Sequence, residues 1–123
     1  MNEHFQTPTM PLQVAQEMTS TTFDLPGYRV VRTVGVVRGI TVRSANIAKQ
    51  FTGAFRTLVG GEIDEYVELA EKSREQAYVR LLQHAAAMGA NAVLGIRYDA
   101  NELVSNMNEV IAYGTGVIVE PLR

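Results

Sequence analysis

The chain has 123 residues, of which 46% are hydrophobic and 20% charged, and its net charge is −2. This composition predicts one folded domain and argues against wholesale disorder. The absence of cysteine excludes disulfides, thiolate zinc sites and cysteine nucleophiles. The N-terminus has no basic and apolar leader and no apolar run is long enough to cross a bilayer, so we expect a cytoplasmic protein without a membrane span.

Residues 1–24 are predicted to form a flexible N-terminal arm, because Thr7-Pro8-Thr9-Met10-Pro11 breaks regular structure. Residues 25–123 are expected to form the single domain. Its first part, residues 28–37, is rich in β-branched side chains and predicts a strand. Arg38-Gly39 is interpreted as a tight reversal, after which residues 40–43 return as a second strand.

Two helices are predicted next. Asn46 or Ser44 can cap the first, whose apolar residues recur at helical spacing from residue 47 to 58. The second is expected between Asp64 and Met88, with an apolar stripe along one side and Gly89 at its end.

The remainder predicts a hairpin of residues 92–99 and 110–119. In the last strand Val110 and Ala112 point to one face while Ile111 and Tyr113 point to the other, so both faces are apolar and each needs a cover. The predicted fold class is α+β, an antiparallel sheet with two helices in β-β-α-α-β-β order. Because helices in this order cover one side, we expect another subunit to cover the second side.

Charge is segregated along the chain. Residues 25–61 carry arginine and lysine without acids, whereas residues 62–75 are rich in glutamate. Solvated faces and pairing between these segments explain the pattern best, and the acidic segment makes nucleic acid an unlikely partner.

Several short motifs occur in an order and at spacings that resemble the YbjQ-like family, small bacterial proteins labelled heavy-metal-binding and otherwise of unknown function. They are Leu25-Pro26-Gly27-Tyr28, Gly35-Val36-Val37-Arg38-Gly39, Asn46, Leu58-Val59-Gly60-Gly61 with Tyr66, Gly89-Ala90-Asn91-Ala92-Val93, and Glu109 to Thr115. The resemblance spans residues 18–119. It implies a dodecin-subunit-like fold that assembles as a ring, most often a homopentamer.

No catalytic constellation stands out, and we predict no enzyme activity and no bound cofactor. The family label makes His84 and Met88, one helical turn apart, the candidate ligands for a metal ion, although soft ions prefer a fuller set of thiolate, thioether or imidazole donors. Asn46, Arg56, Tyr66 and Tyr113 are the polar candidates for contact with a small ligand.

Three functional hypotheses remain open at this point. The preferred one is a ring-forming oligomeric module that binds a small ligand or ion between subunits. The alternatives are a heavy-metal-binding protein and an enzyme whose active site forms between subunits from Glu62, Tyr66, Arg56 or His84.

Overall fold

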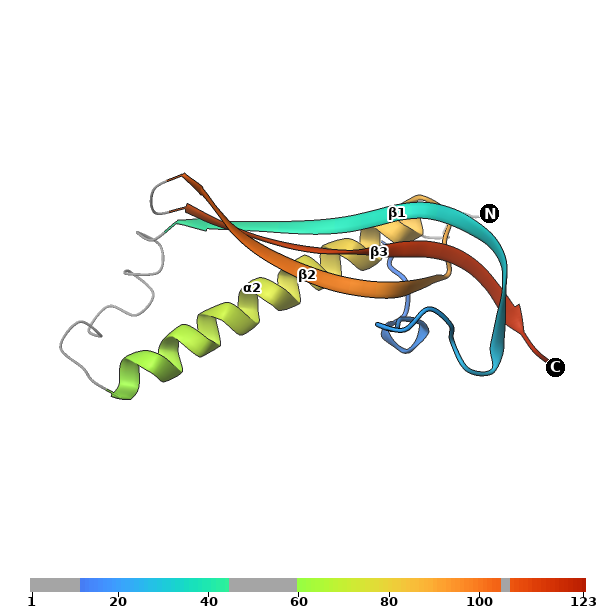
Figure 1. The fold of residues 1–123 in the computed structure, drawn as a ribbon, viewed down its shortest axis with the longest axis horizontal. Coiled ribbons are helices and arrows are strands. Elements are labelled where there is room, and N and C mark those ends of the chain that lie inside the picture. Colours follow the sequence, from blue (N-terminus) through green and yellow to red (C-terminus); the bar gives the residue numbers. More distant parts are fainter. Residues whose placement is uncertain (1–11, 45–59, 105–106) are drawn as a thin grey trace, which may run out of the picture.

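The computed structural model describes residues 12–44, 60–104 and 107–123. These residues form a short 3-10 helix η1 (Gln16–Met18), strand β1 (Tyr28–Ser44), helix α2 (Gly60–Ala87), strand β2 (Ala92–Val104) and strand β3 (Met107–Pro121). The three strands make one antiparallel sheet in the order β1-β3-β2, and α2 lies along one side of it (Figure 1).

The predicted order of β-β-α-α-β-β with two helices is wrong for the described residues, which follow the order β-α-β-β with a single α-helix and a three-stranded sheet. The reversal expected at Arg38-Gly39 does not occur. Both residues continue β1, where they pair with Tyr113 and Ala112 of β3. The helix predicted for residues 47–58 lies outside the described residues.

Gly39 is required for the approach of α2, not for a turn. A Cβ atom at this position would lie 2.1 Å from the carbonyl oxygen of Ala77 and 2.3 Å from the amide nitrogen of Leu81. The helix backbone therefore rests directly on the strand backbone, a contact that only glycine permits. This contact fixes the position of α2 relative to β1.

The second predicted helix is confirmed as α2, although it begins four residues earlier than Asp64. Its C-terminal half supplies the centre of the core, where Ala77, Leu81, Leu82 and Ala85 are buried. The helix ends as predicted at Gly89, which has a φ of +95° and donates to the carbonyl of Ala86 while Ala90 donates to that of Ala85. This pair of bonds satisfies carbonyls that the helix end leaves free.

The predicted C-terminal hairpin is also confirmed, since β2 and β3 pair antiparallel from Ala92 opposite Val117 to Val104 opposite Met107. Asn91 closes its open end. Its side-chain amide donates to the carbonyl of Val119 at 3.0 Å, and its side-chain oxygen accepts from the amide of the same residue at 2.8 Å. The motif from Gly89 to Val93 thus connects α2 to the sheet and fixes their relative position.

The described part of residues 1–24 begins at Leu12 and lies against the domain. Val14 is buried and its amide donates to the carbonyl of Leu82. Further on, Ser20 and Thr22 exchange backbone hydrogen bonds with residues 93–96 at the outer edge of β2. Leu25 then joins Ala92, Leu94, Val117 and Val119 in a second apolar cluster on the side of the sheet opposite α2.

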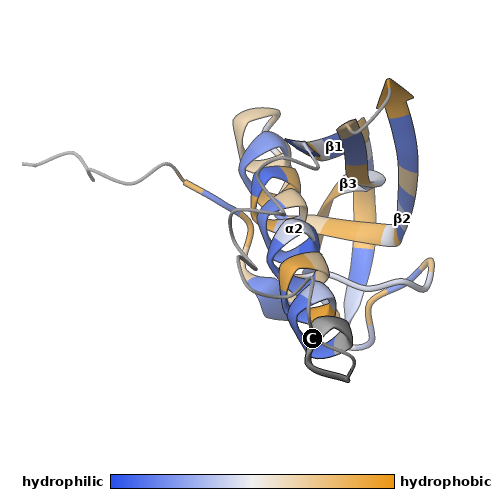
Figure 2. Ribbon diagram, turned by 90° about the vertical axis from the view of Figure 1, so that its left-hand side faces the viewer, coloured by the Kyte–Doolittle hydropathy of each residue, from blue (hydrophilic) through white to orange (hydrophobic). Residues whose placement is uncertain are grey.

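Both faces of β3 are apolar, as the sequence predicts. Val110 and Ala112 face α2, and Figure 2 shows this helix on one side of the strands. The other side is covered by the Leu25 cluster only toward the C-terminal end of β3. Its remaining surface, called the open face here, carries Val36, Ile40, Val42, Ile111 and Tyr113, and Val36 and Val42 are 69% and 47% exposed.

Within the described ranges no helix combines the length and the apolar character that a membrane crossing requires. Although α2 has 28 residues, charged side chains occur along most of it.

The Gly39→Ala substitution is expected to destabilise the fold strongly, by about 3 kcal/mol or more, because the added methyl group must displace the backbone of α2. Urea unfolding followed by circular dichroism would measure the loss. Val42→Ala, an exposed change in the same strand, is the matched control and should cost less than about 1 kcal/mol. A Gly39→Ala variant as stable as this control would contradict the helix placement.

Candidate functional site

A cavity of about 360 Å³ lies between the N-terminal half of α2 and the sheet. Its volume is at the lower end of the range of small-molecule pockets. The described residues that line it come from all three strands and the helix: Thr41, Arg43, Ser44, Tyr66, Leu69, Ala70, Ser73, Arg74, Ala100, Asn108 and Val110. No acidic residue is among them.

The cavity exists because α2 packs on the sheet along only part of its length. Ala77 and Leu81 touch the strand backbone at Gly39, whereas one and two turns earlier the helix presents Ser73 and Ala70. These small side chains leave space above Thr41 of β1 and Val110 of β3, which pair directly. Leu69, Ala70, Ala100 and Val110 form the apolar part of the lining.

Thr41 is the most unusual residue of the cavity. Only 2% of it is exposed, yet its hydroxyl oxygen has no hydrogen-bond partner among the residues that the structure describes. A buried hydroxyl without a partner costs about 1–3 kcal/mol relative to a satisfied one. The cavity wall therefore holds a polar group that a bound molecule can satisfy.

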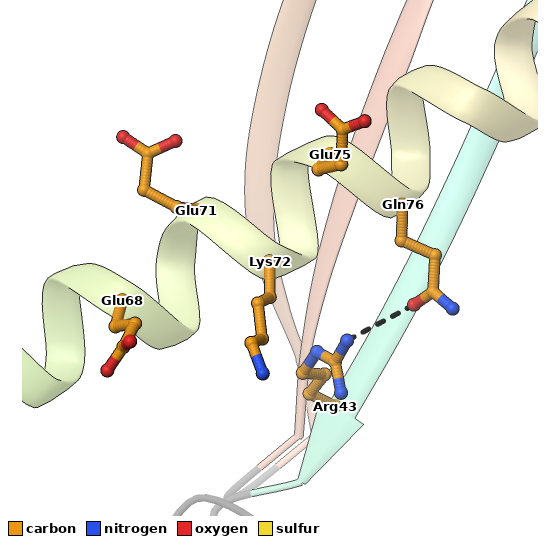
Figure 3. Close-up of a pocket in the computed structure, with 6 residues that line it drawn as sticks. All are labelled: Arg43, Glu68, Glu71, Lys72, Glu75 and Gln76. Atoms are coloured by element: carbon orange, nitrogen blue, oxygen red, sulfur yellow. Dashed lines mark hydrogen bonds between the residues drawn. The ribbon is translucent and has the colours of Figure 1, made fainter.

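Arg43 forms one side of the cavity and is held there by neutral partners. Its Nε donates to the Ser73 hydroxyl at 2.8 Å and one terminal nitrogen donates to the Gln76 side-chain oxygen at 3.2 Å. Arg43 also lines a neighbouring, more open pocket, shown in Figure 3, where Glu68 and Lys72 extend from the same side of α2 as the guanidinium and Glu71 and Glu75 extend from the other side. The bonds to Ser73 and Gln76 hold the guanidinium in place without a carboxylate partner in either bond.

Arg74 brings a second positive charge to the cavity. It belongs to α2 and Arg43 belongs to β1, and both residues line the space. Burial raises the pKa of the Tyr98 hydroxyl, Tyr78 and Glu75 raise it further, and Arg74 opposes them. Together these effects favour the neutral form of the Tyr98 hydroxyl.

Of the four ligand candidates from the sequence, Tyr66 lines the cavity. Tyr113 lies on the opposite side of the sheet, where it pairs with Arg38 and Arg97 in the backbone register. Asn46 and Arg56 lie outside the described residues. The structure therefore does not bring Tyr66 and Tyr113 together in one site.

His84 lies at the edge of β1 rather than at the cavity. Its Nδ1 accepts the backbone N–H of Arg38 at 3.0 Å, and Arg80 donates to the carbonyl of Ile40 at 2.7 Å beside it. These side chains satisfy edge groups of the strand. Because Nδ1 is an acceptor, the proton of the neutral ring sits on Nε2.

This tautomer disfavours coordination of a metal ion by His84. Coordination through Nε2 would move the proton to Nδ1 and break the bond to Arg38. The second metal candidate, Met88, is 47% exposed just beyond the end of α2. Among the residues that the structure describes, no cluster of three or more histidine, aspartate or glutamate side chains is arranged to hold a metal ion.

Sequence reasoning missed Thr41, Arg43, Ser73, Arg74 and Asn108. A signal for the first two was present, because residues 41 and 43 share the strand parity of the buried Val37 and therefore face α2. The false turn at Gly39 concealed this parity. For Ser73, no sequence pattern distinguishes a serine in a helix–sheet contact from one beside a cavity.

Residues 18–120 match the model of the YbjQ family, described as "putative heavy-metal-binding". Relatives called UPF0145 protein include one from Sulfurisphaera tokodaii, 50% identical over 89% of this chain and 96% of the relative. Another, from Chromobacterium violaceum, is 50% identical over 86% of this chain and 91% of its own. A crystal structure from Pediococcus pentosaceus, of unknown function, shares the fold with a TM-score of 0.55 at 18% identity, covering 83% of this chain and 96% of that one.

Removal of the imidazole in His84→Ala is expected to leave the binding of zinc, copper and nickel unchanged while costing about 1 kcal/mol of stability through the lost acceptor. Elemental analysis of the purified protein, followed by titration with each ion at neutral pH, checks the first part. Thermal unfolding checks the second, with Gln83→Ala as the control. One-to-one zinc binding that disappears in His84→Ala would contradict this assignment.

Proposed function

The chain belongs to the YbjQ family, and we propose that it is a self-associating binding module whose cavity between α2 and the sheet takes a small organic molecule. This proposal concerns binding and includes no chemical step. The earlier hypothesis placed the ligand site between subunits. The present proposal places it in a pocket that is lined by residues of one chain.

The buried hydroxyl of Thr41 is the observation that carries the proposal. Valine has nearly the same shape and would fill the position without an unsatisfied polar atom, so threonine makes the empty fold less stable than it could be. A ligand that accepts or donates one hydrogen bond at Thr41 offsets that cost. Residues that lower stability in this way are concentrated at functional sites.

The lining favours an organic molecule over a heavy-metal ion. Soft metal ions prefer sulfur and imidazole donors, and the described lining residues offer hydroxyls, one amide and two guanidinium groups. The guanidinium groups also repel a cation. The family description therefore has no support from the chemistry of this cavity.

An active site that uses Tyr66 together with His84 of the same chain is not supported either. The two residues are separated along α2 by roughly 27 Å at about 1.5 Å per residue. One side chain lines the cavity and the other caps the edge of β1.

The binding proposal is tested by filling the cavity. Ala70→Phe is expected to abolish binding of molecules from a fragment library of neutral, anionic and cationic aromatics, because its ring occupies the pocket. Ala87→Phe, at an exposed position of the same helix, is the matched control. Amide chemical shifts of Thr41 and Val110 report binding, and hits that shift these amides equally in both variants would refute the site.

Thr41→Val adds an independent measurement. It should raise the free energy of unfolding by about 1 kcal/mol without ligand and weaken every hit that shifts the Thr41 amide. A loss of stability together with unchanged affinity would show that the hydroxyl has no role in binding.

The open face supports the proposal of self-association. On this face, the basic residues Arg38 of β1 and Arg97 of β2 pair with Tyr113 of β3, one on each side. Further along the strands the same face carries the acidic residues Asp99 and Glu109. A second copy can place its acids against these bases while it covers Val36 and Val42, and the ring of five implied by the family resemblance is one such arrangement.

A charged residue on the open face should break this association. Val36→Glu is expected to shift the protein to a smaller species in size-exclusion chromatography with light scattering, because a carboxylate would be buried beside apolar groups. Val67→Glu makes the same change at an exposed valine of α2 and should not alter the mass. An unaltered monomer in wild type and both variants at micromolar concentration would overturn self-association.

A further inference from the structure

We infer that the ligand of the cavity is a small organic anion, a carboxylate with an apolar body. This inference rests on the proposed binding function and adds the chemical class of the ligand. It follows from the charge of the lining, the arrangement of its polar and apolar parts, and the buried hydroxyl of Thr41.

The charge of the cavity is the first step. Arg43 and Arg74 both line the space and none of its described lining residues is acidic. Toward the described residues, Arg43 uses two of its five N–H groups, on Ser73 and Gln76, so its planar end retains donors while those bonds hold its position. A fixed guanidinium with free donors matches the geometry of a carboxylate.

The hydroxyls provide the second step. Ser73 accepts the bond from Arg43, which leaves its own proton to be donated, and the buried Thr41 hydroxyl has no partner within the described part of the chain. Thr41 and Arg43 are two residues apart on the same face of β1, so their polar groups flank one region of the cavity. An anionic head group there would receive bonds from both.

The apolar residues provide the third step. Leu69 and Ala70 of α2 face Ala100 and Val110 of the sheet across the cavity. An apolar body fits between these side chains, whereas a highly polar ion such as inorganic phosphate would leave them facing water. The lining as a whole is therefore complementary to a molecule with one charged end and one hydrophobic end.

A matched pair of probes tests this inference. 4-Phenylbutyrate and 4-phenylbutanamide have the same shape and differ in charge. Isothermal titration calorimetry is expected to give at least about tenfold tighter binding for the carboxylate, with the difference reduced at high salt. Arg43→Gln should remove most of this preference and leave the affinity for the amide within about twofold.

Two further variants keep the test decisive. Arg74→Gln changes an exposed residue and should weaken the preference even where Arg43→Gln fails to fold, as judged by thermal unfolding. Arg32→Gln, on an exposed part of β1 away from the cavity, should change neither affinity. A preference that survives in both folded cavity variants, or that falls equally in Arg32→Gln, would overturn the assignment.

The outcomes separate this inference from the proposal beneath it. If the amide binds as tightly as the carboxylate and Ala70→Phe blocks it, the cavity binds ligands but the anionic class is wrong. If neither probe binds at millimolar concentration, or if Ala70→Phe changes nothing, both the class and the proposed function fail.

Discussion

The contact between two backbones at Gly39 determines most of this structure. Interdigitating side chains normally separate a helix from the sheet on which it packs. Here the helix backbone reaches the strand itself, at a point where any side chain would collide with Ala77 and Leu81. Toward its C-terminus α2 completes a dense core with Leu82 and Ala85, and toward its N-terminus it stands over the cavity. The core and the candidate site therefore lie on the two sides of one close contact.

The sequence predicted the elements that depend on local patterns. The long helix, its glycine stop and the final hairpin all have periodicity or capping residues that act within a few positions. The continuity of β1 was missed because Gly39 was interpreted as a turn residue that tolerates positive φ, whereas its use for a helix approach depends on residues about forty positions away. Thr41, Arg43 and Ser73 form a site only when strand and helix meet. Tyr66 was selected from a family motif and does lie at that site, whereas His84 was selected for its metal chemistry and serves the edge of a strand.

The family description and the geometry favour different ligands. A heavy-metal site needs several soft donors that converge, and the chain has no cysteine. The cavity instead brings together guanidinium and hydroxyl groups, which are donors of hydrogen bonds and suit an acceptor. The heavy-metal description belongs to the family model, whereas the residues that line the cavity belong to this chain. Where the two differ, the residues themselves carry the stronger physical argument.

The cavity and the open face occupy the two sides of the same strands. Thr41 and Val110 line the cavity, while their neighbours Ile40, Val42 and Ile111 point to the other side. A second copy bound to the open face would lie on the side of the sheet away from α2. Such association would therefore leave the cavity between α2 and the sheet accessible. The same alternation couples the two surfaces mechanically, because a shift of β1 that moves Ile40 also moves Thr41. Rigid strands held by neighbouring subunits would keep Thr41 and Arg43 in place before a ligand arrives, and such preorganisation reduces the entropy that binding must overcome.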